Sequence, residues 1–148
     1  MNLTPEIMKQ FIEKPFPFIE RMGLRAIVME PCRIKLSLPL EDNGNHIGSM
    51  YAGALFTIAE VPAGALYLTS FDTTRFYPIV KEMNIRYRRP ALTDVTIEME
   101  MTKKEVARIE TEAEKKGKAD FKLEGKIEDT AGEVVAISCG IYQLRKIK

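Results

Sequence analysis

The stretch that decides the fold is residues 51–69, YAGALFTIAEVPAGALYLT, in which nearly every position is apolar. Its nineteen residues are far too many for a buried strand, whereas a helix that is apolar on all sides is typically buried on all sides. Glu60 is the only acidic or basic residue in this stretch. Pro62 is expected to kink the helix just after Glu60, because proline removes a backbone donor and crowds the preceding turn.

Segments with a period of two surround this helix in the sequence. In residues 33–39, Ile34, Leu36 and Leu38 alternate with polar residues, which predicts a strand with one buried and one solvated face. Similar patterns predict further strands at 22–30, 79–89, 94–101, 118–128 and 133–145. Residues 129–132, DTAG, predict the hairpin turn between the last two strands.

Two other helices are indicated by their end signals. The Thr4-Pro5 pair is a favourable helix start, and the helix that follows is expected to end before Pro15 or Pro17. Residues 102–105, TKKE, form a capping box, and Gly117 is expected to end that second helix. Residues 41–50 are rich in turn formers and are expected to form a loop.

These elements predict an α+β fold in which an antiparallel sheet of about six strands curls around one apolar helix. We expect residues 1–148 to form a single domain, because no linker, repeat or low-complexity segment interrupts them. One subunit is not expected to cover the helix completely. A homodimer or homotetramer that continues the sheet would cover it and would also protect the edge strands.

The composition argues against several classes of function. The chain has 22 basic and 21 acidic residues in 148, which gives a net charge of +1. A nucleic-acid-binding protein typically has an excess of basic residues, and this chain does not. One histidine and two cysteines argue against a tetrahedral zinc site and against a disulfide framework. We expect no metal and no resident cofactor, and we expect a cytoplasmic protein without a membrane span, because Glu60 and Pro62 interrupt the longest apolar run.

Residues 45–60, NHIGSMYAGALFTIAE, place a polar loop at the start of the buried helix and one acidic residue, Glu60, within it. The first turn of a helix offers unpaired N–H groups and a partial positive charge, and the small residues Ala52 and Gly53 would let a carbonyl oxygen approach them. Burial should raise the pKa of Glu60, which suits a general base or a nucleophile. Asn45 would hold the attacking water or the substrate carbonyl.

This motif resembles the signature of the hotdog-fold thioesterase superfamily, in particular its phenylacetate-pathway branch and uncharacterised relatives. That branch shows an asparagine, a Gly-Ser or Gly-Thr pair, two small residues, and an acid fifteen residues after the asparagine. The resemblance implies a hotdog fold and hydrolysis of an acyl-CoA, with coenzyme A as part of the substrate. It also implies roles for six residues in this motif: Glu60 and Asn45 in catalysis, and Ala52, Gly53, Gly48 and His46 at the oxyanion or substrate site.

Other interpretations stay open at this point. Many relatives have His-Gly-Gly where this chain has Tyr51-Ala52-Gly53, a difference that favours an acyl-binding module without turnover. His46 and Glu60 also have the spacing of hotdog dehydratases, which would make the protein a hydroxyacyl dehydratase, although the prolines of that motif are missing.

Four of the candidate site positions also have plain structural interpretations. Glu60 could be a structural carboxylate paired across an interface, and Asn45 a turn residue. Arg88 and Arg89 could bind coenzyme A phosphates or form a solvated edge.

Overall fold

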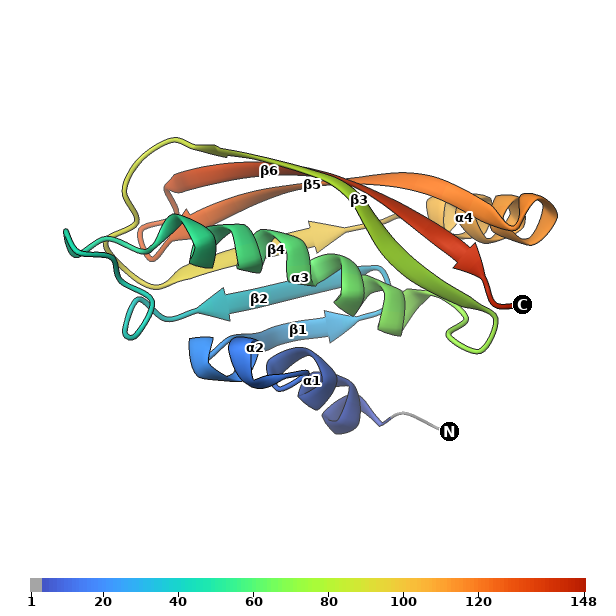
Figure 1. Ribbon diagram of the computed structural model, residues 1–148, viewed down its shortest axis with the longest axis horizontal. Helices are drawn as coiled ribbons and strands as arrows, with labels where there is room; N and C mark the ends of the chain where they lie inside the picture. The colour runs from blue at the N-terminus through green and yellow to red at the C-terminus, as the bar shows by residue number, and fades with distance from the viewer. Residues whose placement is uncertain (1–3) are drawn as a thin grey trace.

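The computed structural model describes residues 4–148 and contains four helices and six strands. Figure 1 shows the helices on one side of a long curved sheet, with α4 at one end. The elements, in chain order, are α1 (Pro5–Glu13), α2 (Pro17–Met22), β1 (Arg25–Glu30), β2 (Arg33–Leu38), α3 (Ala52–Ser70), β3 (Phe76–Tyr87), β4 (Val95–Glu100), α4 (Lys103–Lys116), β5 (Lys118–Asp129) and β6 (Val134–Lys146).

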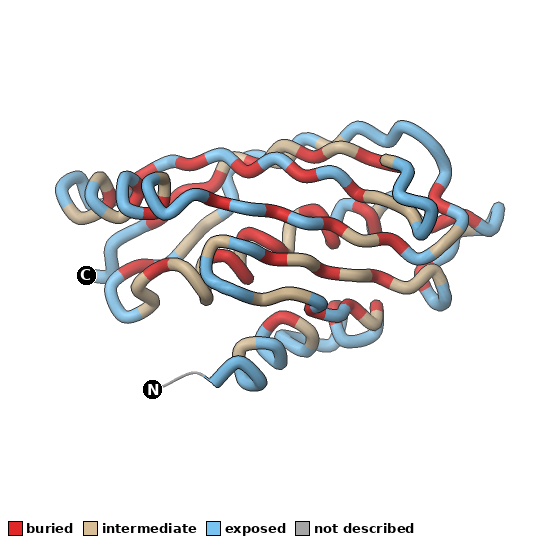
Figure 2. Tube along the Cα trace, turned by 180° about the vertical axis from the view of Figure 1, so that it is seen from behind, coloured by how far each residue is buried: buried red, intermediate tan, exposed pale blue. Residues whose placement is uncertain are grey.

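The six strands form one antiparallel sheet with the order β1-β2-β4-β5-β6-β3. The register aligns Leu36 with Ile97, and Ile97 with Ile127, so that one face of the sheet is apolar and packs against α3. Figure 2 shows the resulting alternation of buried and exposed residues along the strands. A curled sheet around a central apolar helix is the hotdog fold, and this prediction is confirmed.

Helix α3 is buried on the side that faces the sheet. Its buried residues are Ala54, Leu55, Ile58, Ala59, Pro62, Ala63, Ala65 and Leu66. As expected, one subunit does not cover the helix completely, because Phe56 is 38% exposed and Glu60 is only half-buried. The helix continues through Pro62. By length and composition α3 could span a membrane, but here it is the core helix of the sheet.

The N-terminal segment contains a second helix, α2, that the sequence pattern did not predict. Helix α1 begins after Thr4, whose hydroxyl accepts a hydrogen bond from the Ile7 N–H, as predicted. Helix α2 (Pro17–Met22) then follows in a segment for which no helix was predicted. Its signals were present, because Pro17 occupies its first turn and Gly23 ends it with a φ of 71°, a left-handed conformation that favours glycine.

The predicted strand boundaries need two corrections. Strand β1 begins at Arg25 rather than at residue 22, because α2 occupies residues 17–22. Strand β3 begins at Phe76 rather than at residue 79, since it is an edge strand and tolerates Pro78. The predicted turn is confirmed: Asp129 Oδ1 accepts hydrogen bonds from the N–H groups of Ala131 and Glu133.

The predicted start and end of α4 are also confirmed. The Thr102 hydroxyl accepts a hydrogen bond from the Glu105 N–H at the N-terminus of the helix. At the other end, Gly117 caps the helix in a left-handed conformation.

Candidate functional site

The loop before α3 is organised by the side chain of Asn45. Its Oδ1 accepts hydrogen bonds from the N–H groups of Ile47 (3.0 Å) and Ser49 (3.1 Å). Its Nδ2 donates to Ser49 Oγ at 2.9 Å, and Gly48 adopts a positive φ of 85° within the same turn. These contacts support the turn-residue interpretation of Asn45; they use its Oδ1 and one of the two N–H groups of its amide.

The first turn of α3 presents two free backbone donors. The carbonyl oxygen of Tyr51 accepts from the N–H groups of Ala54 (3.0 Å) and Leu55 (3.2 Å), and Tyr51 provides no side-chain cap. Within residues 4–148 no acceptor is seen for the N–H groups of Ala52 and Gly53. These two donors, at the positive end of a nineteen-residue helix, can stabilise an oxyanion.

Gly53 lies against the ring of its neighbour Tyr51. A Cβ atom at position 53 would lie 2.5 Å from Cε1 of the Tyr51 ring, closer than Cβ atoms pack in proteins. The Tyr51 side chain is nevertheless 61% exposed. An exposed aromatic ring therefore covers one side of the amides that were predicted to bind the substrate carbonyl.

Two pockets lie on either side of this helix start, and Asn45 lines both of them. The larger has a volume of about 740 Å³ and combines apolar side chains of α2 and α3 with the loop. Its lining residues are Phe18, Arg21, Met22, Asp42, Asn43, Gly44, Asn45, His46, Tyr51, Gly53 and Ala54. The smaller, of about 350 Å³, is lined by Asn45, Ser49, Met50, Ala52, Leu55, Tyr87, Arg88, Arg89, Pro90 and Ala91.

Glu60 lies further along α3, on the side of the helix that the sheet leaves open. It is half-buried, and burial raises the pKa of its carboxyl group above the ordinary value of 4.5. No ion pair or hydrogen bond to its carboxylate is found among residues 4–148, so this part of the chain provides no structural partner for it. Tyr142 lies near enough for the charge of Glu60 to add to the effect of burial in raising the pKa of the Tyr142 phenol.

The structure does not bring all predicted site residues together within one chain. Glu60 is eight residues beyond Ala52, which corresponds to about 12 Å along a helix that rises 1.5 Å per residue. Asn45, Gly48, Ala52 and Gly53 gather at the helix start, whereas Glu60 lines neither pocket there.

Three further candidates lie at or near this helix start. His46 is an exposed loop residue that lines the larger pocket. It therefore lies at the end of α3 away from Glu60, and the dehydratase pair is not assembled in one chain. Arg88 and Arg89 line the smaller pocket, where Arg89 forms an ion pair with Glu133 and Arg88 forms none with the described residues.

Three side chains at the site could not be predicted from the sequence. Phe18 forms part of the larger pocket and is 50% exposed. The Tyr87 hydroxyl donates a hydrogen bond to the Ala52 carbonyl oxygen at 3.1 Å, linking the edge strand β3 to the first turn of α3. Tyr142, on β6, lies over Gly140 and donates to Met83 Sδ at 3.2 Å. The only sequence signal that bears on these three residues is the pair Pro17 and Gly23, which delimit the helix that carries Phe18.

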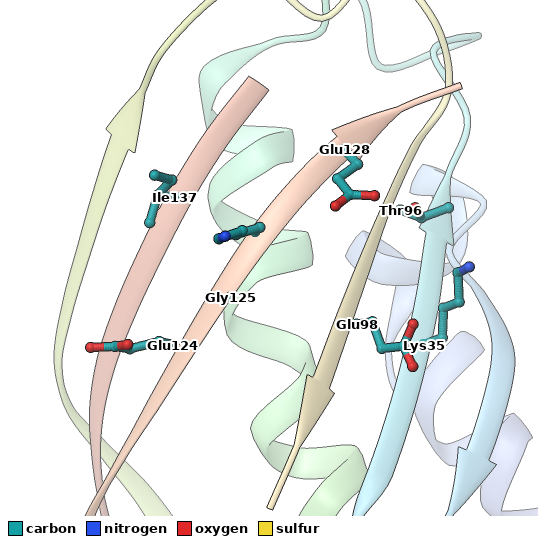
Figure 3. A pocket seen from close by; sticks show the side chains of 8 residues that line it. Lys35, Thr96, Glu98, Glu124, Gly125, Glu128 and Ile137 are labelled. Carbon is teal, nitrogen blue, oxygen red and sulfur yellow. The ribbon is translucent and has the colours of Figure 1, made fainter. Parts of the chain in front are cut away.

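A hollow of about 360 Å³ on the outer face of the sheet lies apart from this site (Figure 3). It is lined by Lys35, Thr96, Glu98, Glu124, Gly125, Lys126, Glu128 and Ile137. Across the strands, Lys35 is aligned with Glu98 and Glu98 with Lys126, so charges of opposite sign are neighbours. Helix α3 lies on the other side of the sheet, and the hollow has no access to Glu60 from this face.

No group of three or more His, Cys, Asp or Glu side chains in residues 4–148 is arranged to hold a metal ion. The two cysteines, Cys32 and Cys139, are free thiols with intermediate exposure. The chemistry available at the site is therefore that of a carboxylate, backbone amides and the polar loop.

The chain is similar to known proteins along nearly its whole length. The family model described as "Domain of unknown function (DUF4442)" matches residues 4–142. A crystal structure from Pseudomonas aeruginosa, described as the protein of unknown function PA5026 and a probable thioesterase, is 52% identical, has a TM-score of 0.96, and the alignment covers 99% of each chain. No match was found among curated proteins.

Two more distant structures share the fold. The protein OLEI01261 of unknown function from Chlorobaculum tepidum is 22% identical, with a TM-score of 0.75 and 98% of each chain covered. The thioesterase enzyme SAV0944 from Staphylococcus aureus is 19% identical, with a TM-score of 0.70 and coverage of 86% of this chain and 98% of the other. It was solved as variants in which a glutamine or a glutamate is replaced by alanine.

Proposed function

Since the chain belongs to the DUF4442 family, within the hotdog-fold thioesterase superfamily, we propose that it hydrolyses acyl thioesters, with an acyl-CoA as substrate. The observation that carries the proposal is Glu60, a half-buried carboxylate without a partner among the described residues, on an apolar helix whose first turn has two free N–H groups. A buried carboxylate without a structural partner is costly, and a functional role would explain its presence.

The proposed active site lies between two subunits. Strand β3 is a free edge of the sheet, and the open side of α3 next to it carries Phe56 and Glu60. Antiparallel pairing of two β3 edges about a twofold axis would place the two α3 helices side by side in opposite directions. If the axis passes near Phe56, about midway between Gly53 and Glu60, each Glu60 faces the first turn of the partner's α3. A homodimer, or a tetramer built from two such dimers, would thus complete the site.

The reaction follows from these groups. The thioester carbonyl oxygen accepts hydrogen bonds from the N–H groups of Ala52 and Gly53, which stabilise the oxyanion as it forms. As a base, Glu60 takes a proton from the water that attacks the carbonyl carbon, and the proton passes to the thiolate when the C–S bond breaks. As a nucleophile, Glu60 attacks the carbonyl carbon, the C–S bond breaks to release the thiolate, which takes up a proton, and water then hydrolyses the resulting anhydride. The raised pKa of Glu60 suits either role, because it makes the carboxylate a stronger base.

The two pockets suggest how the substrate lies. We assign the acyl group to the larger pocket, where Phe18, Met22 and Tyr51 offer apolar surface next to Gly53. The pantetheine arm then leaves past Asn45 towards the smaller pocket. There Arg88, which forms no ion pair with the described residues, is the better candidate for a coenzyme A phosphate, because Arg89 is engaged by Glu133. His46 and Gly48 border the entrance to the larger pocket.

A second candidate function is acyl binding without turnover. It is favoured by the ring of Tyr51, which lies against Gly53 and restricts the approach of a carbonyl to the amides. In this alternative the acyl group occupies the larger pocket and Glu60 takes no part in a reaction.

The two positions changed in the S. aureus enzyme are fifteen residues apart, as are Asn45 and Glu60, and this equal spacing makes the pair the first target for substitution. The finer assignment to the phenylacetate-pathway branch and the cytoplasmic location stay predictions.

The experiment that separates the two functions is a thiol-release assay with a panel of aliphatic and aromatic acyl-CoAs. The thioesterase proposal expects continuous release of coenzyme A from at least one substrate. Saturable binding of acyl-CoA by calorimetry, without thiol release from any substrate, would instead establish the binding module.

A further inference from the structure

The one like-charge pair in the registers of the described strands lies at the far end of the sheet from the α3 N-terminus. Lys118, the first residue of β5, is aligned directly with Arg145 of β6. Both are exposed, and neither forms an ion pair with a described residue. Like charges directly opposite each other on neighbouring strands destabilise a sheet, so this pair needs an explanation.

Elsewhere on the outer face the cross-strand neighbours compensate each other, as in the row that contains Lys35, Glu98 and Lys126. Cations also favour the C-terminal end of a helix, which accounts for Lys116 in the last turn of α4. That argument does not extend to Lys118 and Arg145, because both lie on strands.

The surroundings of the pair form a concave site. A pocket of about 490 Å³ is lined by Tyr77, Lys116, Gly117, Lys118, Arg145, Lys146, Ile147 and Lys148. These residues come from β3, α4, β5 and β6 and its C-terminal extension, which meet at one end of the molecule (Figure 1). No Asp or Glu side chain is among them. The nearby carboxylates are engaged, because Glu114 pairs with Arg75 and Lys146, and Glu112 with Lys116. Asp120, whose charge also acts on Lys118, pairs with Lys81.

The guanidinium group of Arg145 is held in place for binding. Its Nε donates to Gln143 Oε1 at 2.8 Å, and Gln143 Nε2 in turn donates to Asp120 Oδ1 at 2.7 Å. The other Asp120 oxygen receives the ammonium group of Lys81 at 2.8 Å. This chain of hydrogen bonds fixes the Nε edge of Arg145 and leaves its terminal nitrogens free. A guanidinium so fixed matches the geometry of phosphate.

An aromatic ring completes the row. Tyr77 of β3 is aligned with Arg145 on its other side and is 42% exposed. The order across the strands is thus ammonium, guanidinium and phenol ring. We propose that this pocket, formed by Lys118, Arg145 and Tyr77, binds a phosphorylated nucleotide, with the phosphate between the two cations and the base against the Tyr77 ring. The volume lies within the range of small-molecule sites.

A second copy of the chain is a poor occupant for this pocket, because symmetric contact would bring uncompensated cations together. The nucleotide can come from two sources: a free nucleotide, or the nucleotide end of a coenzyme A thioester, in which case this pocket takes the place of Arg88 as the phosphate site of the proposed function. Both share the phosphate and the planar base.

The test measures binding of adenosine 3′,5′-bisphosphate, coenzyme A and ATP by calorimetry to the wild-type chain and to the Lys118→Gln/Arg145→Gln double variant. The matched control is Lys103→Gln/Lys104→Gln, which removes the same charge from the other end of α4. We expect at least a tenfold weaker affinity in the double variant, an unchanged affinity in the control, and wild-type affinity that falls as salt rises.

A thermal measurement on the ligand-free protein gives a second readout. Relief of the repulsion should raise the Tm of the double variant, and the nucleotide should raise the Tm of the wild-type chain but not of this variant. Equal affinities in the double variant and the control, or no binding by the wild-type chain, would overturn the proposal.

Kinetics with coenzyme A and pantetheine thioesters identify the source of the nucleotide. A raised KM for the acyl-CoA alone assigns the site to the substrate, and an unchanged KM together with lost nucleotide binding assigns it to a free nucleotide. Binding does not depend on turnover, so a Glu60→Gln variant should retain it. Failure of the thioesterase proposal would therefore leave this one standing, and the reverse also holds.

Discussion

The amide group of Asn45 donates a hydrogen bond to the hydroxyl oxygen of Ser49 at 2.9 Å, while its carbonyl oxygen receives the Ser49 N–H at 3.1 Å. This double contact closes the loop that leads into α3. The residue expected to position substrate is thus also the residue that shapes the loop, and substitutions can separate the two roles.

Asn45→Ala should lower the free energy of unfolding by about 1–3 kcal/mol, because it leaves the N–H groups of Ile47 and Ser49 without their acceptor. Asn45→Asp keeps that acceptor, and the Ser49 hydroxyl can turn to donate to it, so its Tm should stay near that of the wild-type chain. If the Asn45 amide also contacts substrate, Asn45→Asp should lose thioesterase activity although it is folded. Full activity in Asn45→Asp would restrict Asn45 to the loop.

The contact between Tyr51 and Gly53 predicts a coupling between the two positions. Gly53→Ala gains up to about 1 kcal/mol of helix propensity, but its methyl group must displace the Tyr51 ring. The stabilisation should therefore be larger in a Tyr51→Ala background than in the wild-type chain, by about 0.5 kcal/mol or more. A double-mutant cycle from denaturant unfolding measures this difference, and purely additive effects would argue against the contact.

The raised pKa of Glu60 predicts a pH-dependent gain of stability on its removal. Because the folded state disfavours the ionised form, Glu60 costs no stability below pH 4.5, where it is protonated in both states, and its cost grows as the pH rises through the raised pKa. Glu60→Gln should thus raise the Tm at pH 8 and leave it unchanged at pH 4. Glu41→Gln, which changes an exposed glutamate, serves as the control. Equal shifts in the Tm of Glu60→Gln at both pH values would show that the burial of Glu60 has no effect on stability.

The open side of α3 predicts an interface. We expect the wild-type chain to sediment as a dimer or a multiple of it, and Phe56→Lys to dissociate it, because two copies would place like charges near the proposed twofold axis. Phe16→Lys changes an aromatic residue that is 53% exposed on another surface and should leave the assembly intact. Sedimentation velocity of the three proteins decides the matter; a monomeric wild-type chain or an intact Phe56→Lys assembly would contradict the proposed interface.

Much of the fold could be read from local patterns. The apolar run of α3, the alternation in β2 and the capping box of α4 are signals that residues a few positions apart supply by themselves. Helix α2 was missed although Pro17 and Gly23 delimit it, because six residues carry too little periodicity to recognise. The predicted start of β3 was too late in the sequence, because Pro78 argues against a strand unless the strand is known to be at an edge.

The candidate site was predictable only where it is continuous in sequence. The helix start and Glu60 belong to one segment and could be selected for that reason. Phe18, Tyr87 and Tyr142 reach the site through the packing of α2 and the pairing of β3 with β6, which the sequence does not specify locally. The apolar surface of α3 predicted burial on all sides, and pattern alone could not tell which side one subunit leaves open.

Whether Glu60 performs hydrolysis is decided by kcat/KM for thiol release from the best acyl-CoA substrate, measured for the wild-type chain and for Glu60→Gln. We expect a loss of at least about 100-fold in a variant that is no less stable than the wild-type chain at neutral pH. A Glu60→Gln variant that releases thiol at the wild-type rate would contradict this expectation.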